Sequence, residues 1–249
     1  MEIIEYKLLF DAEKVGFWPV ARREILREKI LKYQKNNESK KILDIGCGPG
    51  GNILLLKEFG HVTGLDFSEE ALKFAKTNNF DSLVQASATN IPFIDASFDM
   101  VTSLDVLEHI QDDNTAIQEA LRVLKPGGMY VVTVPAYQAL WSQHDVSMHH
   151  IRRYLKSELL SKLNKVGFEI DYHTYFIMLS VPIRILQILK DKLFKNNLSR
   201  DKVSNKVEYS GPVNSFLLFL LRIEKIMLRY VKVPFGTSIL VIARKNRVD

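Results

Sequence analysis

The stretch LDIGCGPGG, residues 43–51, decides the fold of this chain. A short apolar run precedes its glycines, and NILLLKEF follows them with the spacing of a helix that ends at Gly60. Gly46, Gly48 and Gly50 let the backbone turn tightly and approach a ligand without Cβ clashes, and the helix behind them offers free N–H groups. The stretch therefore predicts a strand, a ligand-binding glycine loop and a helix.

Strand and helix patterns alternate along most of the remaining chain. Ser68 and Ser157 are predicted N-caps, and Gly167 is a predicted helix end. Such alternation predicts an α/β fold with a parallel sheet that helices cover on both faces. The predicted strands are 41–45, 61–66, 82–87, 97–104, 129–134, 168–176 and 237–245, and the predicted helices are 52–59, 69–76, 113–124 and 158–166.

Two segments, 135–156 and 176–235, lie outside this alternation, and we expect the first to be a polar, aromatic-rich, irregular connection. Residues 2–35 have a helical pattern, with a break predicted near Pro19. Residues 176–235 contain two apolar stretches, but Arg184 interrupts the first and four charged residues interrupt the second. A helix that spans a membrane needs about 20 mostly apolar residues. We therefore expect helices packed on the core, and the alternative is amphipathic helices that lie in a membrane surface.

The composition is that of an ordinary globular domain. Of the 249 residues, 47% are hydrophobic and 25% are charged, which excludes collagen, coiled coil and disorder as descriptions of the whole chain. Cys47 is the single cysteine, so no disulfide can form within the chain. Since the N-terminus also lacks a secretory signal pattern, we expect a cytoplasmic protein, with peripheral membrane contact through residues 176–235 as the alternative.

The positive charge lies in the C-terminal part of the chain. The whole sequence has 34 basic and 29 acidic residues, and residues 176–249 hold 14 of the basic and five of the acidic ones. This excess predicts a surface for an anionic partner such as a small molecule, a peptide or a glycolipid, and the alternative is an ordinary solvated face. We see no aromatic stacking platform beside it, so we expect no nucleic-acid partner.

Two acidic residues bear on the ligand of the glycine loop. Asp66 ends the next predicted strand, 22 residues after Asp44, where a carboxylate can hold ribose hydroxyls. The spacing of Gly46, Gly48 and Gly51 also satisfies the dinucleotide pattern, so a nicotinamide-dependent oxidoreductase is one alternative. Asp44 disfavours it, because phosphates need no carboxylate beside them, whereas a cofactor with an amino group and a sulfonium can use one.

Four motifs in order now carry a resemblance. DIGCGPG, GLD with Asp66, FDMVTSLDVLEHI and LRVLKPGG cover roughly residues 40–135, and together they resemble the class I S-adenosylmethionine-dependent methyltransferases. The resemblance implies a Rossmann-like sheet of seven strands whose last strand is antiparallel. It implies one domain, residues 1–249, with an N-terminal helical cap, a cofactor-binding core and a helical substrate-side extension before the last strand. These parts are 1–39, 40–175 with 236–247, and 176–235.

The same resemblance implies S-adenosylmethionine as cofactor and assigns its contacts. The glycine loop would line the methionine part, with Asp44 near its amino group. Asp66 would hold the ribose, Phe67 would lie against the adenine, and Leu104 and Asp105 would flank the methionine moiety. The residues with implied contacts are Asp44, Gly46, Cys47, Gly48, Gly50, Asp66, Phe67, Ser87, Ala88, Leu104 and Asp105.

One of these positions departs from the family. Many members have an acidic residue before Ala88, where it meets the adenine amino group, and this chain has Ser87 there. We expect a weaker or water-mediated contact. Cys47 is most simply a small loop residue, because no paired base is evident nearby.

The acceptor side is predicted in PAYQALWSQHDVSMHHIRRY, residues 135–154, after the fifth strand. Ligands bind at this carboxyl edge in such sheets. The pattern LWS.HD….H.RRY resembles a bacterial subgroup of the family whose acceptors are diverse: sugars, lipid-linked glycans, natural products and peptides. The candidate catalytic residues are His144, Asp145, His149, Arg152, Arg153 and Tyr154.

The chemistry of the acceptor decides which of them matter. A hydroxyl acceptor must lose a proton, for which His144 oriented by Asp145 or a distant acid is suited. A carboxylate acceptor needs a positive clamp instead, and Arg152 or Arg153 could provide it. We therefore predict O-methylation of a carboxylate or hydroxyl on an anionic acceptor. N-methylation of an amine and a non-catalytic cofactor-binding protein are the alternatives, and no cysteine or histidine spacing suggests a metal.

Overall fold

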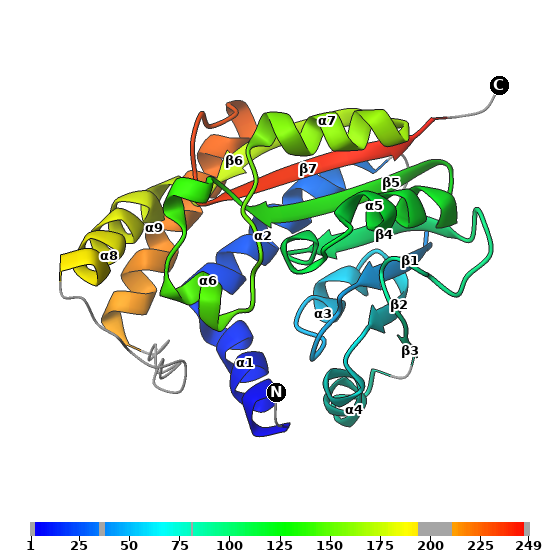
Figure 1. The fold of residues 1–249 in the computed structure, drawn as a ribbon, viewed down its shortest axis with the longest axis horizontal. Coiled ribbons are helices and arrows are strands. Elements are labelled where there is room, and N and C mark those ends of the chain that lie inside the picture. Colours follow the sequence, from blue (N-terminus) through cyan, green and yellow to red (C-terminus); the bar gives the residue numbers. More distant parts are fainter. Residues whose placement is uncertain (1–2, 35–37, 81, 194–210, 247–249) are drawn as a thin grey trace.

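The computed structural model describes residues 3–34, 38–80, 82–193 and 211–246. Seven strands form one sheet in the order β3-β2-β1-β4-β5-β7-β6 (Figure 1). The strands from β3 to β5 pair in parallel, and β7 pairs antiparallel with both β5 and β6. The predicted seven-stranded sheet with an antiparallel last strand is confirmed.

The strands are bounded as follows: β1 Lys40–Ile45, β2 Gly60–Asp66, β3 Leu83–Gln85, β4 Phe98–Leu104, β5 Leu124–Pro135, β6 Phe168–Phe176 and β7 Ser238–Lys245. The α-helices are α1 Ile3–Val15, α2 Phe17–Tyr33, α3 Ile53–Leu56, α4 Glu69–Thr77, α5 Asp113–Val123, α6 Gln143–Ser147, α7 Lys156–Val166, α8 Val181–Leu193 and α9 Pro212–Tyr230. Three short 3-10 helices are η1 Leu107–His109, η2 Gln138–Leu140 and η3 Met178–Ser180.

The middle of the sheet forms the core. β4, β5 and β7 are buried along most of their length, because β-branched and other apolar side chains point to both faces. Figure 1 shows α5 and α7 in front of these strands and α2 behind them. The parallel strands end on the side where α6, α8 and α9 lie, so this edge is where a ligand site is expected.

Local signals decided several helix ends correctly. Ser68 caps α4 by accepting a hydrogen bond from the Ala71 N–H, and Gly167 ends α7 in a left-handed conformation, as predicted. The cap predicted at Ser157 is wrong, because α7 begins one residue earlier at Lys156 and has no side-chain cap. The break predicted near Pro19 is also misplaced. Pro19 fits in the first turn of α2, where its missing N–H costs nothing, and the break lies at Gly16.

Other predicted boundaries shift with tertiary context. The predicted strand 82–87 contains only β3, and the predicted strand 129–134 extends to the whole of β5, which pairs with β4 and β7 on either side. The predicted helix over 52–59 is α-helical only in α3. The segment predicted as an irregular connection, 135–156, contains α6, which Ser142 and Asp145 begin with a reciprocal capping box.

The helices predicted in 176–235 are present as α8 and α9, apart from the part of that range that lies outside the described residues. α9 packs on α2 through buried residues that include Leu221 and Leu228. The burial expected for the apolar stretches is only half fulfilled, because many large side chains on α8 and α9 are exposed. Among the described helices, none is long and apolar enough to cross a membrane.

Candidate active site

The carboxyl end of β1 carries a buried carboxylate with an unused oxygen. Asp44 is 1% exposed, and Thr102 on β4 donates a 2.6 Å hydrogen bond to its Oδ1. Within the described residues, no group hydrogen-bonds to Asp44 Oδ2. Burial, opposed by the Thr102 hydrogen bond, raises the pKa of Asp44 to about 7. A ligand cation beside Oδ2 would satisfy this oxygen and favour the ionised carboxylate.

The loop after β1 has the backbone of a ligand cradle. Gly46 and Gly48 have φ angles of +67° and +54°, a region that favours glycine. A Cβ at Gly46 would lie 2.5 Å from a methyl carbon of Val106, so only glycine fits there. A Cβ at Gly48 would have no atom within 4 Å, so open space adjoins the loop at this point. Gly50 also has a positive φ, of +95°.

Asp66 at the end of β2 fixes this loop. Its Oδ2 accepts a 2.8 Å hydrogen bond from the Gly48 N–H, and its Oδ1 accepts one of 2.8 Å from the Ser68 N–H. Each carboxylate oxygen has a further lone pair, so ribose hydroxyls could still bond to Asp66. The next residue, Phe67, is 79% exposed and offers a flat apolar surface at the same edge.

Asp105 closes the edge after β4. Its φ of +60° is strained for a residue other than glycine, and such strain often marks functional sites. The carboxylate accepts a 3.1 Å hydrogen bond from Thr133 and forms an ion pair with Arg22 of α2. Arg22 also donates a 3.1 Å hydrogen bond to Asn52, so the first helices of the chain are tied to this edge of the sheet.

The remaining predicted cofactor residues lie near the same strand ends. Leu104 and Cys47 are buried, and burial raises the pKa of the Cys47 thiol, which makes it a poor nucleophile. The Ser87 hydroxyl lies 2.7 Å from the Thr89 hydroxyl, and Ala88 packs partly buried against the core. The contacts of these residues with a cofactor stay predictions.

The acceptor-side segment is organised around Asp145. This buried carboxylate accepts hydrogen bonds from His150 Nδ1 at 2.9 Å, Arg153 Nε at 2.7 Å and Arg184 Nη2 at 2.9 Å. Although burial opposes ionisation, these partners together hold the pKa of Asp145 well below its usual range. Asp145 is therefore a fixed anion that joins α6, the segment after it and α8.

Comparison with known proteins agrees with this geometry. Residues 43–132 match the family described as a methyltransferase domain. The chain has a class I S-adenosylmethionine-dependent methyltransferase domain. The demethylmenaquinone methyltransferase of Staphylococcus epidermidis is 35% identical over 135 residues, which are 49% of this chain and 56% of that protein. The chain thus spans little more than half the length of the curated relatives that it matches.

Two solved structures show the extent of the fold. A protein of Bacillus halodurans named as a candidate methyltransferase has a TM-score of 0.57 and 24% identity, with 88% of this chain and 98% of that chain covered. A Thermotoga maritima S-adenosylmethionine-dependent methyltransferase has a TM-score of 0.62 and 18% identity, with 98% and 96% covered. At these identities the likeness shows the fold alone, and it includes the helices added around the methyltransferase domain.

S-adenosylmethionine fits the residues present. The buried, unsatisfied oxygen of Asp44 suits its amino group, and the open space at Gly48 suits close approach of a ligand to the backbone. The two ribose hydroxyls match the free lone pairs of Asp66. The carboxyl ends of β1, β2 and β4 therefore offer groups that fit this cofactor, and its predicted contacts there stay predictions.

The three histidines of the acceptor-side segment lie in different surroundings. His144 reaches solvent at the start of α6, but the protein around its ring and the positive Arg184 lower its pKa to about 4. His149 is exposed with a φ of +58°, and His150 is held inward by Asp145. Among the described residues, the ring of His144 forms no hydrogen bond with Asp145, its neighbour in sequence. Asp145 orients the ring of His150 instead.

The two arginines and the tyrosine of this segment also differ in their partners. Arg153 is buried on Asp145 and on the carbonyl of Ala136, whereas Arg152 bonds to the Gln111 carbonyl and lies 3.3 Å from Asp113. Tyr154 is fully buried and donates a 2.8 Å hydrogen bond to Asp113. The catalytic roles predicted for these residues stay predictions, and their partners give each of them a structural role.

The structure adds one acidic residue to the site that the sequence analysis left out. Glu108 in η1 is 0% exposed, and neither of its carboxylate oxygens has a hydrogen-bond partner among the described residues. Burial and the nearby Asp105 carboxylate raise its pKa well above the usual range. The motif DVLEH could have drawn attention to it, but nothing in the sequence shows that Glu108 points inward.

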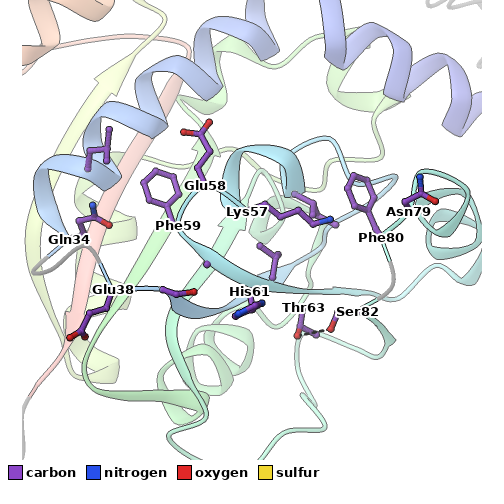
Figure 2. Close-up of a pocket in the computed structure, with 15 residues that line it drawn as sticks. Gln34, Glu38, Lys57, Glu58, Phe59, His61, Thr63, Asn79, Phe80 and Ser82 are labelled. Carbon is purple, nitrogen blue, oxygen red and sulfur yellow. Dashed lines mark hydrogen bonds between the residues drawn. The ribbon is translucent and has the colours of Figure 1, made fainter.

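A cavity lies away from this edge of the sheet. Figure 2 shows this cavity, of about 850 Å³, with Lys57, His61, Thr63 and Phe80 among the residues around it. These residues surround the amino-terminal half of β2, away from the carboxyl strand ends. This cavity is therefore separate from the cofactor site that is predicted at the glycine loop.

Proposed function

We propose that the protein transfers the methyl group of S-adenosylmethionine to an oxygen of a lipid-soluble acceptor. The unsatisfied oxygen of buried Asp44 is the observation that carries the cofactor part of this proposal. S-adenosylmethionine supplies an activated methyl group, so the chain's own task is mainly to align the acceptor and to manage its proton. Asp44, Gly48 and Asp66 bind and orient the donor at the sheet edge.

The apolar face of α8 and α9 supports a lipid-soluble acceptor. We define this face by its exposed large side chains, Ile183, Ile185, Leu186, Leu189, Val213, Phe216, Phe219, Ile223, Ile226, Met227 and Tyr230. Arg184 of α8 bonds directly to Asp145, so the face adjoins the acceptor-side segment. Large apolar side chains exposed along a helix in this way are typical of a contact with a membrane or an apolar ligand. The Staphylococcus epidermidis relative is named for a quinone acceptor, which agrees in kind.

The positive charge of the C-terminal part gives less support to an anionic acceptor. Arg222 and Lys225 form ion pairs with Glu24 of α2, and Arg229 pairs with Glu28. Because carboxylates of α2 neutralise these three cations, their positive charge is not available to bind an anionic acceptor. An anionic acceptor stays part of the proposal only through the cluster around Asp145, where Arg153 and Arg184 share one carboxylate.

Proton removal from a hydroxyl acceptor would fall to His144 in this proposal. Because the pKa of His144 is lowered to about 4, its imidazole is neutral at pH 7 and can accept a proton, though as a weak base. A carboxylate acceptor would need no base. The proposal therefore distinguishes the two acceptors by the effect of His144→Gln, which we expect to lower the rate about 10²-fold for a hydroxyl and little for a carboxylate.

The first test is binding of S-adenosylhomocysteine to the full chain by calorimetry, with NADH as the control. Micromolar binding of S-adenosylhomocysteine alone supports the cofactor assignment. Binding of NADH alone would overturn it in favour of an oxidoreductase. Binding of S-adenosylhomocysteine without methyl transfer to any acceptor would favour a non-catalytic binding protein.

The second test concerns the acceptor. The protein is incubated with methyl-labelled S-adenosylmethionine and lipid vesicles that contain demethylmenaquinone in its quinol form. The label in the organic extract is counted, and mass spectrometry locates it on oxygen or on a ring carbon. Label on a ring carbon would contradict an oxygen acceptor. We expect labelling, and we expect Phe216→Asp with Phe219→Asp to reduce both labelling and vesicle binding. The matched control is Leu54→Asp, whose side chain is as exposed on α3 but lies outside the apolar face. Equal losses in both variants would contradict a role for the face.

A further inference from the structure

Three potential metal ligands meet beside the cofactor edge. Glu108 and His109 come from η1, directly after β4, and His150 comes from the segment after α6. One ligand atom from each residue lies within 4.8 Å of the other two. Two imidazoles and one carboxylate are a frequent protein ligand set for catalytic zinc. Because His150 lies 41 residues after His109 in the sequence, the spacing within either segment does not indicate the cluster.

Glu108 gives the strongest reason to look for a ligand here. A fully buried carboxylate without hydrogen bonds is costly, and native structures seldom retain one without a partner. The Nε2 of His150 lies 3.9 Å from Glu108 Oε1, beyond hydrogen-bond distance. A bound cation between these groups would give the Glu108 carboxylate the partner that it lacks among the described residues.

Each histidine has an oxygen acceptor beside its Nδ1 that can orient the ring. His150 Nδ1 bonds to Asp145 at 2.9 Å, which leaves Nε2 directed toward Glu108. His109 Nδ1 lies 3.3 Å from the backbone oxygen of His149. When one ring nitrogen donates its N–H to a carboxylate or carbonyl, the ring is held in place and the other nitrogen carries a free lone pair. This arrangement is usual for metal-bound histidines.

We propose that Glu108, His109 and His150 bind a divalent transition-metal ion of the zinc class, with a fourth position open. Tetrahedral ligands at about 2.1 Å from an ion are roughly 3.4 Å apart. The ligand atoms lie within 4.8 Å of one another, so they need to close by up to about 1.4 Å. The rings of His109 and His150 already meet edge to face, with centroids 4.9 Å apart. Rotation of exposed His109 can supply most of this movement.

The position of the ion suggests its use. Glu108 lies three residues after Asp105, at the strand end that flanks the cofactor. An ion with an open position can hold an acceptor hydroxyl and make its proton easier to remove. This use rests on the proposed function, whereas binding of the ion does not.

The experiment is a titration of the full, chelator-treated protein with Co²⁺, followed by the visible absorption of the bound ion and by competition with Zn²⁺. We expect one Co²⁺ for each chain and displacement by Zn²⁺. His109→Asn, His150→Asn and Glu108→Gln should each weaken binding about 100-fold or more. His149→Asn is the matched control and should bind Co²⁺ as the wild type does. Its asparagine tolerates the left-handed backbone there.

Thermal unfolding and S-adenosylhomocysteine binding are measured on every variant. Because His109 is exposed, His109→Asn tests the site even if Glu108→Gln fails to fold. Absence of Co²⁺ binding by the wild type, or equal binding by wild type and His109→Asn, would overturn the metal site. Either result could be found in a protein that still binds S-adenosylhomocysteine, so failure of the site and failure of the proposed function are distinguishable.

Discussion

Arg22 on α2 forms a buried ion pair with Asp105 at the carboxyl end of β4. The contact joins the N-terminal helices to the residue expected to flank the methionine part of the cofactor. Arg22 also bonds to Asn52 and lies over the Trp18 ring, 4.6 Å from its centroid. Through Arg22, α2 thus contributes to the predicted cofactor edge.

The first prediction follows from this pair. Arg22→Ala leaves Asp105 without its cation in a largely buried position, and we expect the free energy of unfolding to fall by about 3 kcal/mol. Arg27→Ala is the matched control, because its pair with Glu58 is half exposed, and the expected loss is below about 1 kcal/mol. Urea unfolding at pH 7 measures both. Equal losses would mean that the Arg22 pair stabilises no more than a surface pair.

The second prediction concerns the pH dependence of cofactor binding. The pKa of Asp44 without ligand is about 7, and an ammonium group beside it favours the ionised form. The affinity for S-adenosylhomocysteine should therefore rise by up to about tenfold per pH unit between pH 5.5 and 7, and then level off. Calorimetry across this range measures it. Asp44→Asn should bind weakly with no such slope, and a slope that persists in Asp44→Asn would assign it to another group.

The third prediction is the effect of the same carboxylate on stability. Burial raises the folded-state pKa of Asp44 from its usual 3.8 to about 7. Protonated Asp44 therefore favours folding below about pH 4, and this contribution is lost as the pH rises to about 7. The loss corresponds to about 4 kcal/mol. Asp44→Asn should therefore be more stable than wild type at pH 8, by urea unfolding without ligand. A wild type that is more stable at pH 8 would show that Asp44 has an unrecognised cationic partner.

The fourth prediction separates folding from binding in the glycine loop. Alanine in place of either glycine meets the left-handed backbone, which costs about 1 kcal/mol. Gly46→Ala also clashes with Val106, so we expect a further loss of stability, which thermal unfolding measures. Gly48→Ala has room in the protein alone but projects into the open space, so it should fold and lose S-adenosylhomocysteine affinity. Normal affinity in Gly48→Ala would place the cofactor away from that space.

The fifth prediction tests Asp145. Asp145→Asn leaves Arg153 and Arg184 with a neutral partner in place of a buried anion, so we expect a loss of about 3 kcal/mol or more at pH 7. Because the folded-state pKa of Asp145 is depressed, its contribution is present above about pH 4 and declines as the pH falls further. The difference between wild type and variant should accordingly shrink in urea unfolding at pH 3. A constant difference would mean that geometry rather than charge holds the cluster.

The sequence by itself determined the sheet and the cofactor edge. Strand and helix periods are local properties, and LDIGCGPGG needs glycine at Gly46 whatever lies around it, because of its positive φ. Asp44 and Asp66 could be placed at one edge from sequence alone, since the carboxyl ends of parallel strands meet there. The four motifs in order then identified the cofactor.

Only the tertiary structure decided the partners of the acceptor-side residues. Asp145 follows His144 in sequence, yet it orients His150, because successive side chains on a helix point in different directions. The inward direction of Glu108 and the exposure of α8 and α9 depend on which elements pack against them. Spacing along one segment determines its secondary structure, but contacts between segments depend on packing, and that is why the ligands of the proposed metal site could not be seen in the sequence.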